Sequence, residues 1–230
     1  MAFNLKFVEN RAVRFLLILL ATALAICCDP NHQSEFYSIQ RDDIHGYEEF
    51  IRKYPSSSFV QDAQERIETA KEEARVREEQ ERMVNQYGGN SLSNGSQPYS
   101  MWYGGNQYYD DYTPHSEITV KAPYNSDVIA IVRYDNMNGS VAGHKYIKAG
   151  QSVTIYLRNG HYYQTFFYYG KGWCPDKEMS GKVRGGFVSN ELFSKDGTPS
   201  YLDNQILSYE LTLQRDGNFQ TNPSNEGEMF

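Results

Sequence analysis

Residues 152–169 read SVTIYLRNGHYYQTFFYY, and this stretch decides the expected fold of the C-terminal half of the chain. Asn159-Gly160 is a dipeptide typical of the type I′ turn between two antiparallel strands, and β-branched and aromatic residues flank it on both sides. The pattern predicts a β-hairpin whose register places Tyr156 opposite Tyr163. Successive side chains of each strand then point to opposite faces of the hairpin.

The two faces of this hairpin differ in composition. One face is apolar and is expected to enter a core; it carries Val153, Ile155, Leu157, Tyr162 and Phe166. The other face mixes tyrosine with threonine, and these side chains together can stack on a sugar ring and hydrogen-bond its hydroxyl groups. We therefore identify a candidate ligand face, with a covering loop or linker as the alternative interpretation: Tyr156, Tyr163, Phe167 and, from the following loop, Trp173.

Further β-prone segments surround the hairpin, and Gly, Asn, Asp and Pro separate them. With the hairpin they give about seven short strands, at residues 118–121, 127–134, 145–148, 152–157, 161–169, 186–189 and 206–214. This pattern predicts an antiparallel β-sandwich of the immunoglobulin-like type over residues 114–220, followed by a C-terminal tail at 221–230. Residues 127–134 are apolar on both faces and should be a central strand, residues 206–213 should keep one face in water, and residues 170–175 should be a loop.

Residues 42–87 predict a pair of helices, so the whole chain is expected to be of the α+β type. Apolar residues at helical spacing form a stripe in the first helix, which Pro55 ends. The second helix is expected to begin at Ser58, with Gln61 three residues later as in a capping box. The preceding residues, 28–41, are expected to form a tether.

The composition changes at residues 88–113, where Gly, Asn, Ser and Gln dominate and aromatic residues are scattered without a strand or helix period. This composition predicts a flexible linker between the helices and the β-sandwich. An aromatic segment that contacts sugars or another protein is the alternative.

The N-terminus has the features of an export signal. Lys6, Arg11 and Arg14 precede an apolar run, Phe15–Ile26, which is shorter than the ~20 residues that a membrane-spanning helix needs. We therefore expect a signal peptide over residues 1–27. Two adjacent cysteines close the apolar run.

The junction Leu24-Ala25-Ile26-Cys27-Cys28 resembles the lipobox of bacterial lipoproteins, in which signal peptidase II cuts before a cysteine that carries diacylglycerol. The resemblance implies lipidation of Cys28, with Cys27 as the alternative, and attachment to the membrane through acyl chains such as palmitate. It also implies a place in the bacterial cell envelope. We expect the outer membrane, with the mature chain facing the periplasm or the cell surface.

Two further segments resemble parts of known families. The motif Tyr47-x-x-Phe50-x-x-x-Tyr54-Pro55-x-Ser57 resembles one helical pair of the tetratricopeptide-like repeats of envelope lipoproteins. Because such repeats usually need about three units to bury their faces, a single pair implies a stalk or a surface that packs on a partner. The phrase Ile147-x-x-Gly150-Gln151-Ser152-Val153, with Gly170-Lys171-Gly172-Trp173, looks like a β-sandwich domain of envelope proteins from gut-type anaerobes. This second resemblance implies a fold and export, and no activity.

Composition and spacing argue against several function classes. The net charge is −7 without a basic stripe, so we expect no nucleic-acid partner. The five histidines are dispersed, and no metal, cofactor or catalytic motif is found, so we expect no cofactor and no enzyme activity. Cys174 is expected to be unpaired; a disulfide between Cys28 and Cys174 is the alternative if Cys27 is the lipidated residue.

These expectations together describe a membrane-anchored envelope lipoprotein that acts as a non-enzymatic interaction or structural module with a protein partner. The first alternative is a glycan-binding lipoprotein that uses the aromatic face of the predicted hairpin. The second alternative is an enzyme of uncharacterised activity.

Lipidation can be tested by growing bacteria that express the chain with a clickable palmitate analogue. We expect the wild-type chain and the Cys174→Ser control to be labelled, because Cys174 lies far from the lipobox. The label should vanish when Cys27 and Cys28 are both replaced by serine. Label that persists in this double variant would show that the anchor lies elsewhere.

Overall fold

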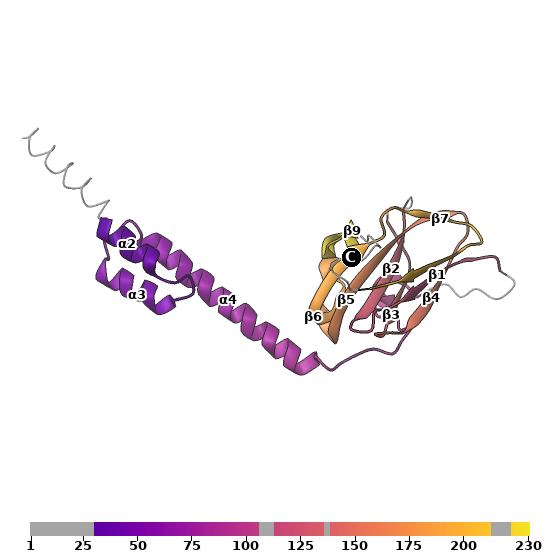
Figure 1. Cartoon of the computed structure of the whole chain (residues 1–230), viewed down its shortest axis with the longest axis horizontal. Coiled ribbons are helices and arrows are strands. Elements are labelled where there is room, and N and C mark those ends of the chain that lie inside the picture. Colours follow the sequence, from indigo (N-terminus) through magenta and orange to yellow (C-terminus); the bar gives the residue numbers. More distant parts are fainter. Residues whose placement is uncertain (1–29, 106–112, 136–138, 213–221) are drawn as a thin grey trace, which may run out of the picture. The chain divides into compact units, whose positions relative to one another are not determined.

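A computed structural model describes residues 30–105, 113–135, 139–212 and 222–230 of the chain (Figure 1). The chain divides into two compact units, Met1–Glu79 and Gln80–Phe230. The described part of the first unit is helical, and the second contains two mostly antiparallel sheets. The chain is therefore of the expected α+β type.

Three helices account for the described part of the first unit: α2 (Pro30–Ser38), α3 (Ile44–Lys53) and α4 (Val60–Tyr87), whose end belongs to the second unit. The carboxylate of Asp43 caps α3, because it accepts a hydrogen bond from the Gly46 N–H at 2.9 Å. Helices α3 and α4 match the predicted pair. The tether predicted over residues 28–41 is wrong for the described part, where α2 buries Phe36 completely.

The second unit has nine strands among its described residues, arranged as a three-stranded sheet, β4-β1-β8, and a six-stranded sheet, β3-β2-β5-β6-β9, in which β7 also pairs with β5. Strands β1 and β8 run parallel, and the other pairs are antiparallel. The strand bounds are β1 (Ser116–Lys121), β2 (Asp127–Tyr134), β3 (Val141–Ile147), β4 (Ser152–Leu157), β5 (His161–Glu178), β6 (Arg184–Lys195), β7 (Ser200–Leu202), β8 (Ile206–Glu210) and β9 (Asn222–Pro223). Short helices are α5 (Ser100–Tyr103), η1 (Ser180–Lys182) and α6 (Glu226–Met229).

Every predicted strand overlaps an observed one, and β7 and β9 were not predicted. The loop predicted at residues 170–175 is wrong, because β5 continues through it to Glu178. Gly170 permits this continuation: a Cβ at this position would lie 2.3 Å from the Cβ of Phe187 on the neighbouring strand β6. The absence of a side chain makes room for Phe187 where the register of the two strands shifts, between Tyr169 and Lys171.

The hairpin predicted around Asn159-Gly160 does not form. Strand β4 pairs with β1, and β5 pairs with β2 in the other sheet, so the turn carries the chain from one sheet to the other. Asn159 fixes this corner, since its side-chain oxygen accepts a hydrogen bond from Ser116 Oγ at 2.6 Å. The burial of the two strands gives the reason. Strand β4 buries alternate residues, whereas β5 is buried on both faces from Thr165 to Gly170 and needs a sheet that is covered on both sides.

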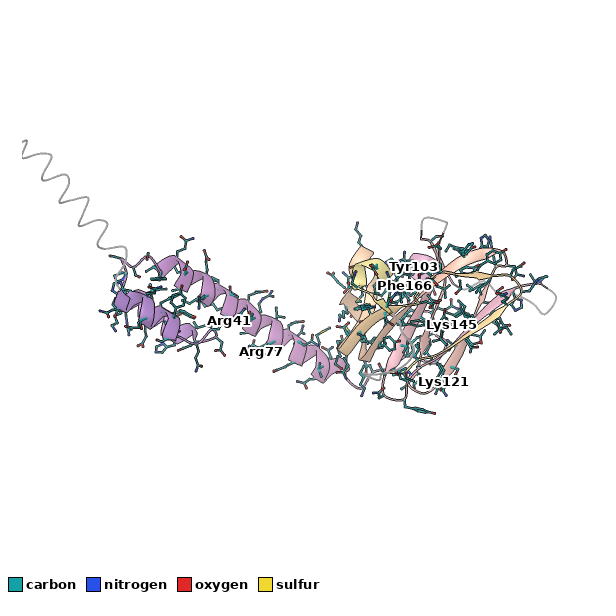
Figure 2. The ribbon with its side chains drawn as sticks, turned by 45° about the horizontal axis from the view of Figure 1, so that its top comes forward. Arg41, Arg77, Tyr103, Lys121, Lys145 and Phe166 are labelled. Atoms are coloured by element: carbon teal, nitrogen blue, oxygen red, sulfur yellow. The ribbon has the colours of Figure 1, made fainter. Side chains whose placement is uncertain are left out.

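The first core lies between the two sheets. It takes Val128, Ala130 and Val132 from β2, all fully buried, together with Ile118 and Ile155 from the facing sheet. Lys145 Nζ also joins the sheets by donating to the carbonyl oxygen of Thr154 at 2.7 Å (Figure 2). Strand β2 lies between β3 and β5, as its apolar sequence predicted for a central strand.

A second core covers the opposite face of the six-stranded sheet. Ile129 and Ile131 of β2 are fully buried in it, although they point away from the first core. Residues 88–105, here called the strap, and the C-terminal residues pack over this face. Figure 2 labels Tyr103 of the strap and Phe166 of β5, which both belong to this cluster.

Two sequence predictions are therefore wrong for the residues that the structure describes. The flexible linker predicted at residues 88–113 is packed on the β domain over residues 88–105, on the face of the six-stranded sheet opposite to Tyr163 and Phe167. The tail predicted at 221–230 is docked over residues 222–230, where Met229 is fully buried. Arg133 holds this end, because its Nη2 donates to the carbonyl oxygen of Met229 at 2.7 Å. In both segments apolar side chains are buried against the sheet, although their spacing in the sequence follows no helix or strand period.

Tyr99 anchors the strap. Its side chain is fully buried, and its hydroxyl donates to the carbonyl oxygen of Gly185 at 2.9 Å. Its backbone N–H donates to His144 Nε2 at 3.0 Å. The strap also pairs with the edge of β3, where the N–H of Gly95 donates to the carbonyl oxygen of Tyr146 at 2.8 Å and the Tyr146 N–H donates to that of Ser96 at 2.7 Å. This pairing covers a sheet edge that would otherwise be open to other chains.

Replacing Tyr99 tests how strongly the strap is held. Tyr99→Ala should lower the free energy of unfolding by about 3–5 kcal/mol, because it empties a fully buried aromatic site. Tyr99→Phe removes only the hydrogen bond to Gly185 and should cost about 1 kcal/mol. Met101→Ala is the control, since this side chain is 87% exposed. Urea unfolding measures the three variants, and a Tyr99→Ala protein as stable as the control would contradict the anchor.

The pH dependence of stability tests the contact between Tyr99 and His144. Burial lowers the pKa of His144 from 6.5 to about 4, so the folded protein keeps the ring neutral while the unfolded chain takes up a proton below pH 6.5. The stabilising contribution is therefore complete above pH 6.5 and is lost as the pH falls toward 4. Relative to His144→Gln, which does not titrate, the wild type should lose up to about 3 kcal/mol across this window. A difference between the two proteins that stays constant from pH 7 to pH 4 would refute this role.

Candidate interaction site

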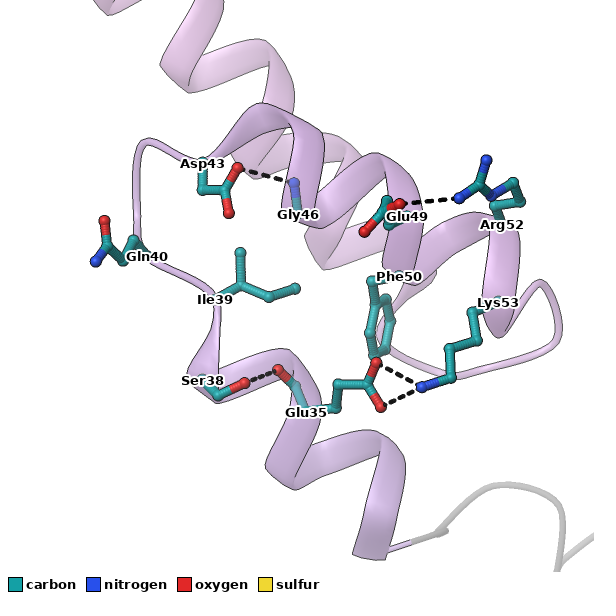
Figure 3. Close-up of a pocket in the computed structure, with 10 residues that line it drawn as sticks. All are labelled: Glu35, Ser38, Ile39, Gln40, Asp43, Gly46, Glu49, Phe50, Arg52 and Lys53. Carbon is teal, nitrogen blue, oxygen red and sulfur yellow. Dashed lines mark hydrogen bonds and ion pairs between the residues drawn. The ribbon is translucent and has the colours of Figure 1, made fainter.

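The helical unit carries an open pocket of about 910 Å³ between the end of α2, the connection at residues 39–43, and α3 (Figure 3). This volume lies within the ~300–1,000 Å³ range of small-molecule and side-chain sites. Ile39 and Phe50 supply its apolar lining, and charged or polar residues supply the remainder.

The pocket wall is shaped by the start of α3. A Cβ at Gly46 would lie 2.4 Å from Asp43 Oδ2 and 3.0 Å from Ile39 Cγ2. Because Asp43 must approach the Gly46 N–H to cap the helix, only glycine fits here without displacing the cap or Ile39. The capping geometry thus also sets the position of Ile39 in the pocket.

A small aromatic core supports the pocket from below. Phe50 is 1% exposed and packs in a cluster with Phe36, Tyr47, Ala63 and Ile67. The Phe36 ring stacks on Phe59 with 5.0 Å between centroids, and the Arg66 guanidinium lies 4.6 Å above Phe36. All three helices therefore contribute to this supporting core, and α2, which was not predicted from the sequence, supplies Phe36 to it.

The rim of the pocket is charged, and its charges pair with one another. Lys53 Nζ lies 2.9 Å from each carboxylate oxygen of Glu35, and the Tyr54 hydroxyl donates to Glu35 Oε2 at 2.7 Å. Hydrogen bonds from Lys53 and Tyr54 lower the pKa of Glu35, and hydrogen bonds with Tyr54 and Glu35 raise the pKa of Lys53. Arg52 forms a second pair with Glu49 at 2.9 Å. These pairs are exposed, so they organise the rim rather than stabilise the fold strongly.

This arrangement is suited to binding rather than to acid–base or nucleophilic chemistry. The pKa of Glu35 is shifted away from neutrality, and that of Lys53 is shifted further from it, so neither is adjusted for proton transfer near pH 7. Ser38 Oγ donates to the carbonyl oxygen of Glu35 at 2.7 Å. An apolar floor with an ordered polar rim is typical of sites that accept a side chain of another molecule.

The sequence did not indicate these residues, because residues 28–41 were interpreted as a tether. A usable signal was present, since Phe36 and Ile39 are apolar and three positions apart, as on one helix face. The signal is short, and Pro30 and Asn31 before it resemble a turn. The helix becomes clear only when its partners on α3 and α4 are known.

The predicted ligand face does not form an exposed surface. Tyr163 and Phe167 are 1% and 0% exposed in the first core, and Trp173 is 5% exposed in the second. Tyr156 belongs to β4 in the other sheet, where it lies opposite Glu117. The four residues separate because the turn at Asn159 joins two sheets and not two paired strands.

The predicted lipidation residues, Cys28 and Cys27, lie outside the described residues. Among the described residues Cys174 is a free cysteine, and it is buried. Within the described ranges, no group of three or more His, Cys, Asp or Glu side chains is placed to hold a metal ion. None of the helices in those ranges has the length and apolar character needed to cross a membrane.

Comparisons with known proteins add no family to this description. No protein-family model, no curated protein and no solved structure matches the chain.

Proposed function

We propose that the chain is a lipid-anchored lipoprotein of the bacterial envelope whose helical unit binds a segment of a partner protein in the pocket between α2 and α3. The observation that carries the proposal is the pocket itself, in which Ile39 and the nearly fully buried Phe50 lie inside a rim of mutually paired charges. An apolar side chain of the partner would enter the floor, while the rim would contact its backbone and polar groups. The lipobox resemblance at Cys27-Cys28 supports the anchor and an outer-membrane location.

We further propose that the β domain is an immunoglobulin-like sandwich that serves as a non-enzymatic platform. Two sheets on either side of a common core support this fold. In the three-stranded sheet, one edge strand, β4, is antiparallel to β1 and the other, β8, is parallel to it, and this arrangement is compatible with a sandwich. Glycan binding at the predicted aromatic face has no support, because those side chains are buried or lie in separate sheets.

Site-specific photocrosslinking in living cells tests the pocket. A benzophenone amino acid in place of Gln40, which lines the pocket, should yield one discrete adduct with an envelope protein. The control places the same probe at Glu48, which is exposed on α3 outside the pocket, and should give no such adduct. Ile39→Asp, which puts a charge on the apolar floor, should abolish the Gln40 adduct. Equal crosslinking from both positions, or an adduct that survives Ile39→Asp, would reject the pocket as the binding site.

A further inference from the structure

Tyr124 is the most exposed large aromatic side chain of the described β domain, with 83% of its surface open to solvent. It lies with Asn125 at the tip of the turn that connects β1 to β2. Two pockets, of about 310 Å³ and 200 Å³, adjoin this tip, and both are lined by Tyr124 and Asn125. The exposed ring therefore stands between a depression with polar groups and a smaller one that is mainly apolar.

The turn that carries Tyr124 is held rigidly on both sides. The N–H of Ala122 donates to the carbonyl oxygen of Gln151 at 2.9 Å, and the Gly150 N–H donates to that of Pro123 at 3.0 Å. On the other side, Ser126 is 3% exposed, and its Oγ donates to the carbonyl oxygen of Gly170 at 3.2 Å. The tip is therefore fixed before any ligand arrives, which reduces the entropy lost on binding.

The Tyr124 ring packs against the backbone of Gly150. A Cβ at this glycine would lie 2.9 Å from Tyr124 Cδ1, so a side chain here would displace the ring. The backbone of Gly150 has φ of +72°, which also favours glycine. The ring rests against this bare backbone and keeps most of its surface exposed.

The larger pocket offers hydrogen-bonding groups of several kinds. Its wall includes Asp127, whose carboxylate accepts hydrogen bonds from the Ala149 N–H at 2.8 Å and from Ser91 Oγ at 3.1 Å, as well as from the Tyr146 hydroxyl. Burial and the bond to Asp127 raise the pKa of Tyr146, so this hydroxyl remains a donor. Across the part of the chain that the structure describes, neither the Asn125 amide nor the Lys171 ammonium group makes a hydrogen bond or ion pair. Both groups line the pocket and are available to a ligand.

The smaller pocket lies on the other side of Tyr124. Lys121 and Glu210 form an ion pair of 2.7 Å at its rim (Figure 2 labels Lys121), and Leu211 contributes an apolar wall. Lys121 Nζ also lies 5.9 Å from the centre of the Tyr124 ring. The formal charges of the two pockets cancel, because Lys121 and Lys171 balance Asp127 and Glu210.

We propose that Tyr124 and Asn125, with the two pockets beside them, form a binding site for an oligosaccharide of uncharged hexose or N-acetylhexosamine units. The apolar face of one sugar ring would stack on Tyr124, and its hydroxyl or acetamido groups would reach Asn125 and Lys171. Neighbouring units would occupy the depressions on either side. The balanced charge of the lining favours an uncharged ligand over an acidic one.

Isothermal titration of the full chain tests this site, in a detergent without a sugar headgroup. The probes are cellohexaose, maltohexaose and chitohexaose, with oligogalacturonate as the acidic comparison. At least one neutral hexamer should bind, with little dependence on salt, and Tyr124→Ala should weaken it about tenfold, as expected for the loss of one stacking ring. Tyr124→Trp should retain binding. Tyr201→Ala is the matched control, because Tyr201 is also exposed, at 48%, and lies on β7.

Several results would overturn the proposal. They are the absence of binding by every neutral hexamer, preferential salt-sensitive binding of oligogalacturonate, and unchanged binding by Tyr124→Ala. Binding lost in Tyr201→Ala but kept in Tyr124→Ala would place the site elsewhere on the domain. Asn125→Ala provides a second test that does not depend on the aromatic substitution, and a thermal melt equal to that of the wild type excludes misfolding. These readouts concern the β domain, so they are independent of the crosslinking at Gln40.

Discussion

The β domain depends on one constraint, which is that its central strand β2 is apolar on both faces. The five residues Val128–Val132 are each 0% exposed, so neither face of the six-stranded sheet can be left in water there. Exposing side chains such as Ile129 and Ile131 would cost about 1.5–3 kcal/mol each. The three-stranded sheet covers one face, and the strap and C-terminal residues cover the other. This second cover comes from both ends of the domain, since the strap precedes the first strand and α6 follows the last.

Covering the second face also creates the surroundings of Tyr124. Gly172 has φ of +71°, and a Cβ there would lie 2.8 Å from Gly88 Cα, so the start of the strap passes directly over β5. The Trp173 N–H then donates to the carbonyl oxygen of Asn90 at 3.0 Å, and Ser91 reaches the Asp127 carboxylate. Residues 88–91 thereby form a wall of the larger pocket. The proposed sugar site therefore exists only in a chain whose strap is docked, which couples the stability of the second core to the binding surface.

The sequence was sufficient for local structure and insufficient for pairing. The apolar run of β2 and the alternation in β4 gave strands with the observed bounds, because side-chain periodicity reports burial directly. The dipeptide Asn159-Gly160 specified a turn, and a turn alone does not determine whether the next strand returns to the same sheet. The strap was misread for a related reason. Its glycines and asparagines resemble a linker, while Tyr99 finds its pocket only through Gly185 and His144, which are distant in sequence. The exposure of Tyr124 and the position of Gly150 beneath it likewise depend on tertiary structure, because the two residues are distant in sequence.

The two candidate sites lie on separate units, and they differ in the interactions that each would make with a ligand. In the helical unit, Ile39 and Phe50 lie beneath a rim whose charges already satisfy one another, so a partner gains mainly from burying its own apolar side chain. On the β domain, Tyr124 projects from a hydrogen-bonded turn, and Asn125 and Lys171 line the pocket beside it, so a ligand gains from stacking and from directed hydrogen bonds. Stacking and hydrogen bonding suit a sugar ring, whereas apolar residues inside a paired polar rim suit a protein side chain. The two proposed sites share no residues, so occupation of one does not block the residues of the other.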